Sequence, residues 1–202
     1  MVKVILVITL LAFILYFIVR RLRMFGTQIR NNYGKIQPSL RIIEITAPAN
    51  ILKAIVQKTL FSVFTGILLL VIILVLATKF KIALIMLPIS LYLIGQFLVL
   101  NNHIRHTRNQ RIFYDKINDD LTIESLEGNR IVFNLITDVK AYKEIKSVQK
   151  NNGILFGYYE MILAKQKITI SYLLKENAEN KTLFDKLAHF PTEVETKLFP
   201  VI

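Results

Sequence analysis

Residues 60–100 read LFSVFTGILLLVIILVLAT (60–78), KFK (79–81) and IALIMLPISLYLIGQFLVL (82–100). Each of the two apolar runs holds 19 residues without a charged side chain. A helix of this length rises about 28 Å, which is close to the roughly 30 Å hydrocarbon thickness of a bilayer. The sequence therefore predicts a transmembrane hairpin over residues 60–100, turned by the short KFK segment.

The charge of the chain lies almost entirely beside these runs. The chain has 202 residues, is 53% hydrophobic and carries a formal net charge of +12. Residues 1–110 hold 13 Lys and Arg against the single acid Glu44, whereas residues 111–202 hold 13 basic and 13 acidic residues. We interpret the excess as the basic flanks of membrane spans, so membrane lipids are expected partners and nucleic acid is not.

A third apolar run, Val4–Val19, is followed by Arg20, Arg21 and Arg23. A signal peptide carries its charge before the apolar core and a small-residue cleavage site after it, which is the reverse of this order. We therefore expect residues 1–19 to be a retained N-terminal anchor, giving three transmembrane helices in total. Whether this short run spans the bilayer fully or is trimmed stays open at this stage.

The basic residues also predict the topology. The segment 20–59 carries eight Lys and Arg, whereas the turn at 79–81 carries two. Because Lys and Arg are enriched on the cytoplasmic side, we expect the N-terminus outside, a basic cytoplasmic loop over 20–59 and a cytoplasmic C-terminal domain, in a bacterial inner membrane. The residues assigned to the membrane flanks are Arg20, Arg21, Arg23, Arg105, Arg108 and Arg111.

Two alternatives remain for residues 48–58. Pro48 suits the first turn of a helix, and apolar residues recur at helical spacing after it. This segment is either an amphipathic helix lying in the headgroup region or a plain N-terminal extension of the first hairpin helix.

The hairpin contains no ionisable side chain, which argues against an ion or proton pathway. Its polar and small residues are expected to form contacts between helices, since small residues let backbones approach closely. The residues assigned to these contacts are Ser62, Thr65, Gly66, Gly95 and Gln96.

After residue 100 the pattern changes to short alternating segments that are typical of strands. Apolar residues alternate over 121–123 and 131–135, and Glu127-Gly128-Asn129 between them predicts a hairpin turn. The charged run 139–145 predicts an edge strand protected by its lysines.

Two further strands are predicted over 156–163 and 168–172. A helix follows, because apolar side chains recur at helical spacing over 183–190 before Pro191 ends it. Thr192 with Glu195 resembles a capping box and predicts one more short helical turn. The result is a small β-barrel or sandwich covered by a C-terminal helix.

This order of elements resembles the bacterial pleckstrin-homology-like membrane proteins, including the YcxB-like group. The segments that carry the likeness are Arg111–Asp115, Leu121–Glu124, Ile131–Asn134, Asp138–Tyr142, Ile168–Leu173 and Ala178–Phe190. The resemblance implies a pleckstrin-homology-like (PH-like) domain over 111–202. Eukaryotic relatives bind phosphoinositides through a basic first hairpin loop, but here residues 115–120 carry three acids against Lys116, which would repel phosphate.

No chemistry-bearing constellation stands out. The absence of cysteine excludes disulfides, thiolate catalysis and iron–sulfur clusters. His103 and His106 share a helix face at a spacing that can serve a metal, but no third ligand is near, so we expect a hydrated juxtamembrane face. The carboxylates Asp119, Asp120 and Glu124 lack a neighbouring nucleophile. We expect no metal, no cofactor and no enzymatic activity.

Two functions remain. The first is an inner-membrane protein that presents its PH-like module at the cytoplasmic face, for interaction with a protein partner or for self-assembly into a homo-oligomer. The alternative is a lipid-handling or transport-associated membrane protein that the PH-like domain regulates.

Overall fold

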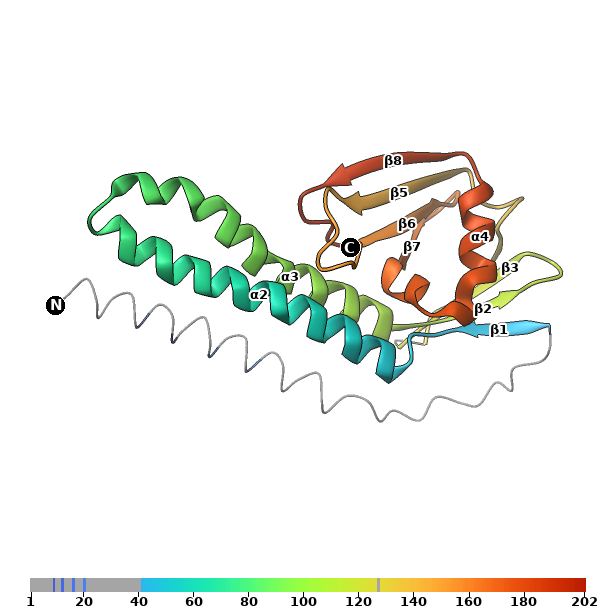
Figure 1. Ribbon diagram of the computed structural model, residues 1–202. Coiled ribbons are helices and arrows are strands. Elements are labelled where there is room, and N and C mark those ends of the chain that lie inside the picture. The colour runs from blue at the N-terminus through green and yellow to red at the C-terminus, as the bar shows by residue number, and fades with distance from the viewer. Residues whose placement is uncertain (1–8, 10–11, 13–15, 17–19, 21–40, 127) are drawn as a thin grey trace. The chain divides into compact units, whose positions relative to one another are not determined.

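The computed structural model describes Thr9, Ala12, Tyr16, Arg20, residues 41–126 and residues 128–202 (Figure 1). The chain divides into two compact units, Met1–Gln37 and Pro38–Ile202, and the fold described below is that of the second. The predicted anchor over 1–19 is therefore not shown as a third span, and Arg21 and Arg23 lie outside the described residues.

The described residues of the second unit form two long helices, a short third helix, eight strands and three 3₁₀ segments. In chain order these are β1 (Ile42–Ile45), α2 (Ala49–Ala77), η1 (Lys81–Met86), α3 (Leu87–Arg108), β2 (Gln110–Asp115), β3 (Asp120–Ser125), β4 (Arg130–Asn134), β5 (Ala141–Ser147), β6 (Gly157–Ile162), β7 (Lys167–Ser171), η2 (Tyr172–Glu176), η3 (Ala178–Asn180), α4 (Lys181–His189) and β8 (Thr192–Lys197).

The helical hairpin consists of α2, the turn after it, η1 and α3. Pro48 precedes α2 with φ −56°, and the helix then runs without a break for 29 residues. Residues 48–58 thus form the first turns of α2. This agrees with the prediction of an N-terminal extension of the first hairpin helix and not with that of a separate amphipathic helix in the headgroup region. Pro88 lies in the first turn of α3, where its missing N–H removes no helical hydrogen bond.

Gly66 sets the distance between the two helices. A Cβ atom at this position would lie 2.7 Å from Cβ of Leu93, so only glycine permits the observed approach. At the same level Ser90 is fully buried and donates a hydrogen bond of 2.9 Å from Oγ to the Gly66 carbonyl. A small residue and a hydroxyl thus join the helices, in the manner typical of apolar helix pairs.

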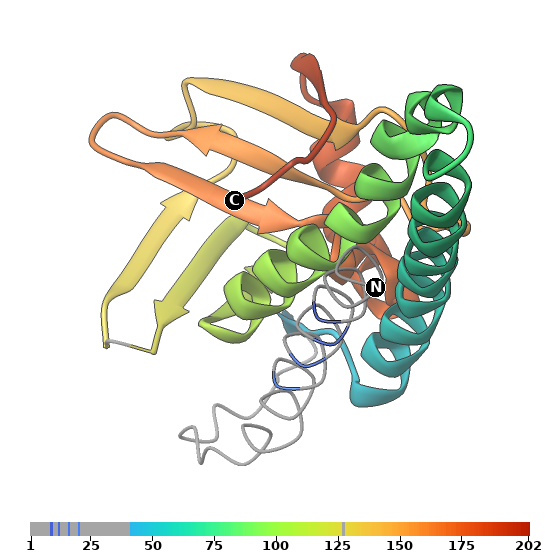
Figure 2. The same cartoon turned by 90° about the vertical axis from the view of Figure 1, so that its left-hand side faces the viewer.

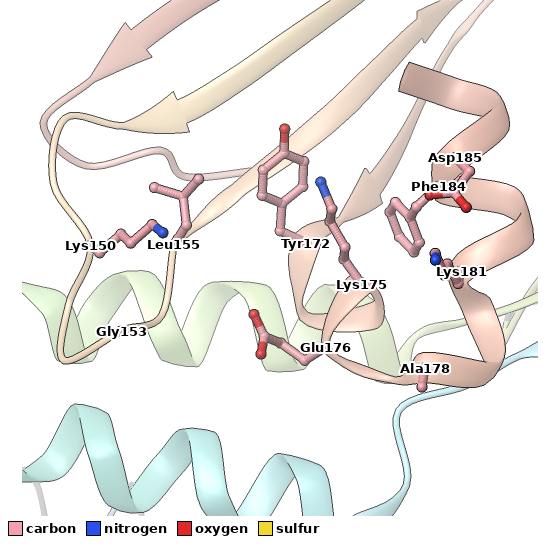
Figure 3. A pocket seen from close by; sticks show the side chains of 10 residues that line it. All are labelled: Lys150, Gly153, Leu155, Tyr172, Lys175, Glu176, Ala178, Lys181, Phe184 and Asp185. Atoms are coloured by element: carbon pink, nitrogen blue, oxygen red, sulfur yellow. The ribbon is translucent and has the colours of Figure 1, made fainter. Parts of the chain in front are cut away.

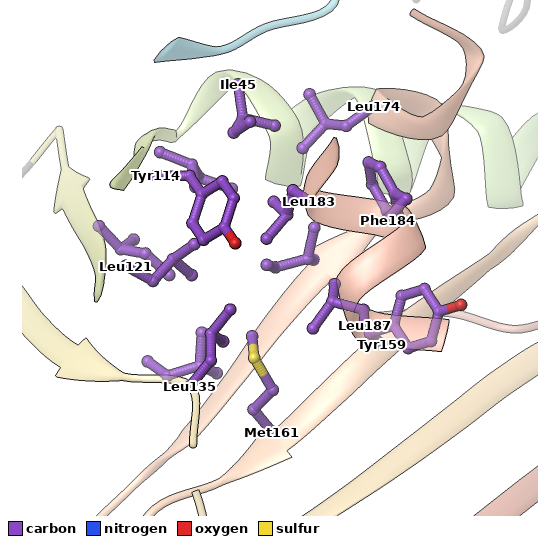
Figure 4. Packing of buried hydrophobic residues seen from close by; sticks show 14 of the residues in the cluster. Ile45, Tyr114, Leu121, Leu135, Tyr159, Met161, Leu174, Leu183, Phe184 and Leu187 are labelled. Carbon is purple, nitrogen blue, oxygen red and sulfur yellow. The ribbon is translucent and has the colours of Figure 1, made fainter. Parts of the chain in front are cut away.

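The β domain consists of two four-stranded sheets with the strand orders β1-β2-β3-β4 and β7-β6-β5-β8. All neighbouring strands are antiparallel except β5 and β8, which are parallel. The inner faces of both sheets share one core, and α4 covers it with Leu183, Phe184 and Leu187 (Figure 4). The β3–β4 hairpin, β6, β7 and α4 lie where the sequence predicted them.

Two local predictions were wrong, and one strand explains both. The segment expected to be a capped helical turn is β8, which pairs with β5 over six residues, from Tyr142↔Thr192 to Ser147↔Lys197. Consequently β5 lies between β6 and β8 and is not an edge strand. A capping box forms two reciprocal hydrogen bonds at the N-terminus of a helix. A parallel ladder between two strands satisfies more backbone groups than this at once.

The β domain also includes β1, a strand from the segment 20–59 that was expected to be a loop. Ile42–Ile45 pairs with β2, so the hairpin is inserted between two neighbouring strands of one sheet. Two ion pairs flank this ladder: Arg41 with Asp115 at 2.8 Å and Arg111 with Glu44 at 2.9 Å. The hydrogen bond from Arg41 lowers the pKa of the Asp115 carboxyl below its ordinary value.

The close approach at Gly66 gives a testable prediction. Gly66→Leu should push the helices apart and destabilise the hairpin by about 1–3 kcal/mol, because a Cβ has no room beside Leu93. The matched control is Thr65→Leu, one residue away on an exposed position. Thermal unfolding of the full chain in detergent checks this: an equal midpoint for the two variants would contradict the tight contact.

Candidate functional site: the junction between the hairpin and the β domain

The strongest concentration of buried polar contacts lies where the hairpin meets the β domain. We call this region the junction: it comprises the middle of α2, the second half of α3, the β5–β6 loop, β7 and the final segment Leu198–Ile202. Figures 1 and 2 both show α3 between α2 and the sheets, so α3 forms the main contact with the β domain.

His103 is the centre of the junction. Its side chain is fully buried, and Nδ1 lies 2.8 Å from Ser171 Oγ while Nε2 lies 2.7 Å from the Pro200 carbonyl. A carbonyl only accepts, so Nε2 carries the proton, and in the neutral ring Nδ1 accepts from the Ser171 hydroxyl. Ser171 Oγ in turn accepts from the Leu173 N–H. His103 therefore links α3, the end of β7 and the final segment in one satisfied network.

His106, one turn further along α3, contacts the outer edge of β7. Its Nε2 lies 3.1 Å from the Thr169 carbonyl and 3.0 Å from Thr169 Oγ1. Gln110 donates to the same carbonyl at 3.3 Å. The expectation of a hydrated face at His103 and His106 was wrong, because the β domain folds back over this face of α3 and supplies partners for both rings.

The final segment lies along α3. The side-chain amide of Asn102 donates to the Ile202 carbonyl at 3.0 Å, and its oxygen accepts from the Ile202 N–H at 2.8 Å. Phe199 fills the space beside Gly95, where a Cβ would lie 2.7 Å from the ring, and it packs near Tyr92 with ring centroids 5.6 Å apart. Gly95 thus accommodates this segment and not the neighbouring helix.

The β5–β6 loop reaches α2. Ser62 donates a hydrogen bond to the Asn151 side chain, and Asn152 donates to the Lys58 carbonyl at 3.4 Å. Thr59 and Gln96 are also buried, and Thr59 Oγ1, Gln96 Nε2 and Asn151 Nδ2 have no hydrogen-bond partner among the described residues. Buried polar atoms of this kind are costly.

The rest of the hairpin presents apolar side chains outward. In the most apolar parts of Ala49–Ala77 and Lys81–Arg108, only 28% and 22% of the residues are buried. Phe61, Phe64 and Ile82 are exposed by 66%, 65% and 74%. Both helices are long and apolar enough to cross a membrane, and exposed apolar surfaces of this kind mark sites of contact with lipid or with another protein.

A lysine-lined pocket opens beside the junction (Figure 3). It has a volume of about 570 Å³ and lies between the β5–β6 loop, η2 and α4. Lys150, Lys175 and Lys181 line it together with the acids Glu176 and Asp185. None of the three lysines forms an ion pair with a residue that the structure describes, which leaves their charges available to an anion.

Tyr172 forms part of the pocket wall and fixes one lysine. The Lys175 ammonium lies 5.3 Å from the centroid of the Tyr172 ring. The Tyr172 hydroxyl donates to the Glu144 carboxylate, and burial together with this hydrogen bond raises its pKa above the ordinary value. The hydroxyl therefore remains protonated at neutral pH and donates its proton to Glu144.

β4 lies at the end of its sheet, and no other strand that the structure describes pairs with its outer edge. The hydrogen bonds Leu135 N to Asp119 O and Ser125 N to Asn129 O show that the odd-numbered residues of β4 face β3. Hydrogen bonding alternates along an antiparallel strand, so the N–H and C=O of Val132 point away from the sheet. The Val132 side chain is 57% exposed.

Two other sheet edges are protected. The edge of β7 is occupied by the contacts of His106 and Gln110 with Thr169. The edge strand β8 carries Glu193, Glu195 and Lys197, and Glu193 pairs with Lys143 at 2.8 Å and raises its pKa. Charged edge strands resist pairing with other chains.

The structure distributes the predicted site residues over several roles. Arg111 belongs to β2 and pairs with Glu44, with its guanidinium 5.2 Å from the Phe113 ring centroid. Arg105 and Arg20 are exposed. Gly66 faces α3, whereas Thr65 bonds to the Phe61 carbonyl of its own helix. Of the remaining helix positions, Ser62 contacts the β5–β6 loop, Gly95 contacts the final segment and Gln96 is buried.

Among the described residues, no group of three or more His, Cys, Asp or Glu side chains could hold a metal ion. Comparison of the chain with family models, with curated proteins and with solved structures gave no match.

The His103 network gives a prediction for the junction. His103→Ala leaves the Pro200 carbonyl and the Ser171 hydroxyl without their partner, at a cost of about 1–3 kcal/mol for each buried group. We expect faster amide hydrogen exchange in Leu198–Ile202 and in the start of η2, measured by mass spectrometry on the full chain in detergent. The control is His189→Ala at the exposed end of α4; unchanged exchange in the final segment would contradict the role of His103.

Proposed function

We propose that the chain is an integral membrane protein whose α2–α3 hairpin crosses the bilayer and whose β domain, PH-like in arrangement, is a cytoplasmic module that binds a protein strand. The strand belongs to a partner protein or to a second copy of the chain. The module acts by binding and not by catalysis. The membrane is the bacterial inner membrane that the family resemblance and the basic flanks indicate.

The hairpin supports the membrane part of the proposal. Its outward apolar side chains continue around the turn, where Phe80 and Ile82 are exposed by 63% and 74%. A lipid environment removes this surface from water without further protein. The pairing of β1 with β2 brings the start of α2 and the end of α3 to one sheet, so the β domain lies on one side of the bilayer.

The open edge of β4 is the observation that carries the binding part. Strand addition needs unpaired backbone groups, and Val132 offers its outward N–H and C=O beside an exposed apolar side chain. β4 is also the strand of its sheet that lies farthest from β1, roughly 14 Å away at about 4.8 Å per strand. A partner can therefore reach this edge without meeting the hairpin.

The buried hydrogen bonds of the junction give the module a defined orientation relative to the hairpin. The buried contacts of His103 and Asn102 tie α3 to β7 and to the final segment. A domain held in this way presents its β4 edge at a constant height above the membrane, which lowers the entropic cost of binding a partner that is itself anchored.

A pair of proline substitutions tests the binding edge. Val132→Pro removes an outward N–H and should leave the β3–β4 ladder intact. The control is Val194→Pro on β8: the Lys197 carbonyl accepts from Val148 N, so by alternation the Val194 N–H also points outward, and its side chain is 51% exposed.

The measurement is chemical cross-linking of the full chain in its membrane, followed by mass analysis. We expect Val132→Pro to reduce the cross-linked species about tenfold or more, through lost backbone hydrogen bonds and a clash with the added strand, while Val194→Pro preserves it. Equal yields for both variants, with equal melting temperatures, would refute the β4 edge as the binding surface.

The lysine pocket favours a second function, the handling of an anionic lipid or phosphate ester. Three lysines without ion pairs among the described residues converge on one hollow, and its two carboxylates leave a net charge of +1. The wall formed by Gly153 belongs to the same loop that contacts Ser62 and Lys58 of α2. The pocket therefore opens near the start of the apolar part of the hairpin.

Binding of two probes tests this second function. Replacement of Lys150, Lys175 and Lys181 by Ala should weaken binding of phosphatidylglycerol in mixed micelles about 100-fold, at about 1 kcal/mol per lysine. Glycerol phosphate as a soluble probe separates a lipid from a free phosphate ester. The control replaces Lys116, Lys140 and Lys165, which are exposed lysines away from the pocket; equal loss in both triple variants would show nonspecific attraction only.

A further inference from the structure

We propose that one end of the β domain enters the headgroup region of the same leaflet from which the hairpin leaves. We call this end the rim: it comprises Val148 in the β5–β6 loop and Leu198, Phe199 and Val201 in the final segment. The inference rests on the proposed membrane function and adds a second point of contact with the lipid, outside the hairpin.

The length of the free hairpin places the rim at the membrane boundary. Beyond the contact of Ser62 with Asn151, α2 has 15 residues left before it ends at Ala77, which is about 22 Å of helix. The hydrocarbon core of a bilayer is about 30 Å thick, and each headgroup layer adds roughly 5–8 Å. A core of 30 Å counted back from Ala77 extends about one and a half helical turns past Ser62, so the level of this contact, where the rim begins, lies within about 8 Å of the hydrocarbon boundary.

The rim is apolar and exposed, although it belongs to the β domain. Val148 is 60% exposed, Leu198 56%, Val201 49% and Phe199 36%. The Val148 N–H donates to the Lys197 carbonyl, so the β5–β6 loop and the final segment form one surface. Phe199 also contacts Gly95 of α3, which makes the rim continuous with the apolar surface of the hairpin.

Basic side chains lie beside the apolar ones of the rim. β5 and β8 both run toward this end of the domain, which carries Lys150 and Lys197. Lys197 pairs with Glu195 at 3.4 Å, whereas Lys150 forms no ion pair with a residue that the structure describes. A cytoplasmic leaflet with anionic lipids attracts such a lysine, so this end of the domain suits the headgroup region.

The partner is therefore the bilayer and not a protein. An interfacial surface of this kind combines apolar side chains that enter about 5–10 Å with basic residues at headgroup level. Since Phe199 lies directly against a helix of the hairpin, any protein bound at the rim would have to displace the lipid around that helix.

Single cysteines test the inference, and the chain contains no native cysteine that would interfere. We would label Val148→Cys at the rim with an environment-sensitive fluorophore and reconstitute the full chain into vesicles that contain brominated lipid. Val132→Cys on β4 is the matched control, because the two valines are exposed by 60% and 57%. Ile72→Cys, 46% exposed in the part of α2 beyond the junction, reports on the hairpin itself.

We expect strong quenching at Ile72→Cys and at least about threefold more quenching at Val148→Cys than at Val132→Cys, since only the rim reaches the acyl boundary. A label on Leu198→Cys should behave like the one on Val148. If Ile72→Cys is quenched while Val148→Cys and Leu198→Cys match Val132→Cys, the rim inference is overturned and the hairpin stands. If Ile72→Cys is not quenched either, the membrane function itself fails.

Discussion

The pairing of β1 with β2 is the constraint on which the architecture depends. These strands come from opposite ends of the hairpin, yet four residue pairs and the ion pairs of Arg41 with Asp115 and Arg111 with Glu44 hold them together. The chain must therefore leave the sheet through α2 and return to it through α3. Asn177 and Asn180 both donate to the Thr46 carbonyl and fix the exit from β1. Any crossing of a membrane by this hairpin is consequently a two-way crossing.

The junction is a second place at which the hairpin is attached to the β domain. The β1–β2 ladder alone would fix only the base of the hairpin, and the β domain could swing about it. The buried His103 network and the amide pair between Asn102 and Ile202 attach α3 to the domain a further one to two turns along the helix. Buried hydrogen bonds contribute modestly when formed and cost more when broken. They therefore restrict the domain to one orientation more than they add to its total stability.

The sequence predicted those features that depend on neighbouring residues. The apolar runs indicated the hairpin, alternation indicated the β3–β4 pair, and helical spacing indicated α4. It could not predict β1 or β8, because Ile42–Ile45 and Thr192–Lys197 become strands only through partners about 70 and 50 residues away. The same reason applies to the site. Nothing near His103 in the chain shows that Ser171 and Pro200 will flank it, and Gly95 gives no indication that a distant phenylalanine needs its space.

The hairpin and the rim form one continuous apolar surface, with Lys150 beside it. The turns at the far end of the sheets carry charges of both signs, such as Asp138 and Lys140. Three edges of the two sheets also differ: β7 is covered by α3, β8 is charged, and β4 is open and farthest from β1. A domain that only needed to be soluble would have no reason to leave its most distant edge unpaired, since an open edge promotes unwanted association. In a protein whose β domain is attached to the hairpin at two points, that edge lies away from the hairpin, and its accessibility is what the proposed binding module requires.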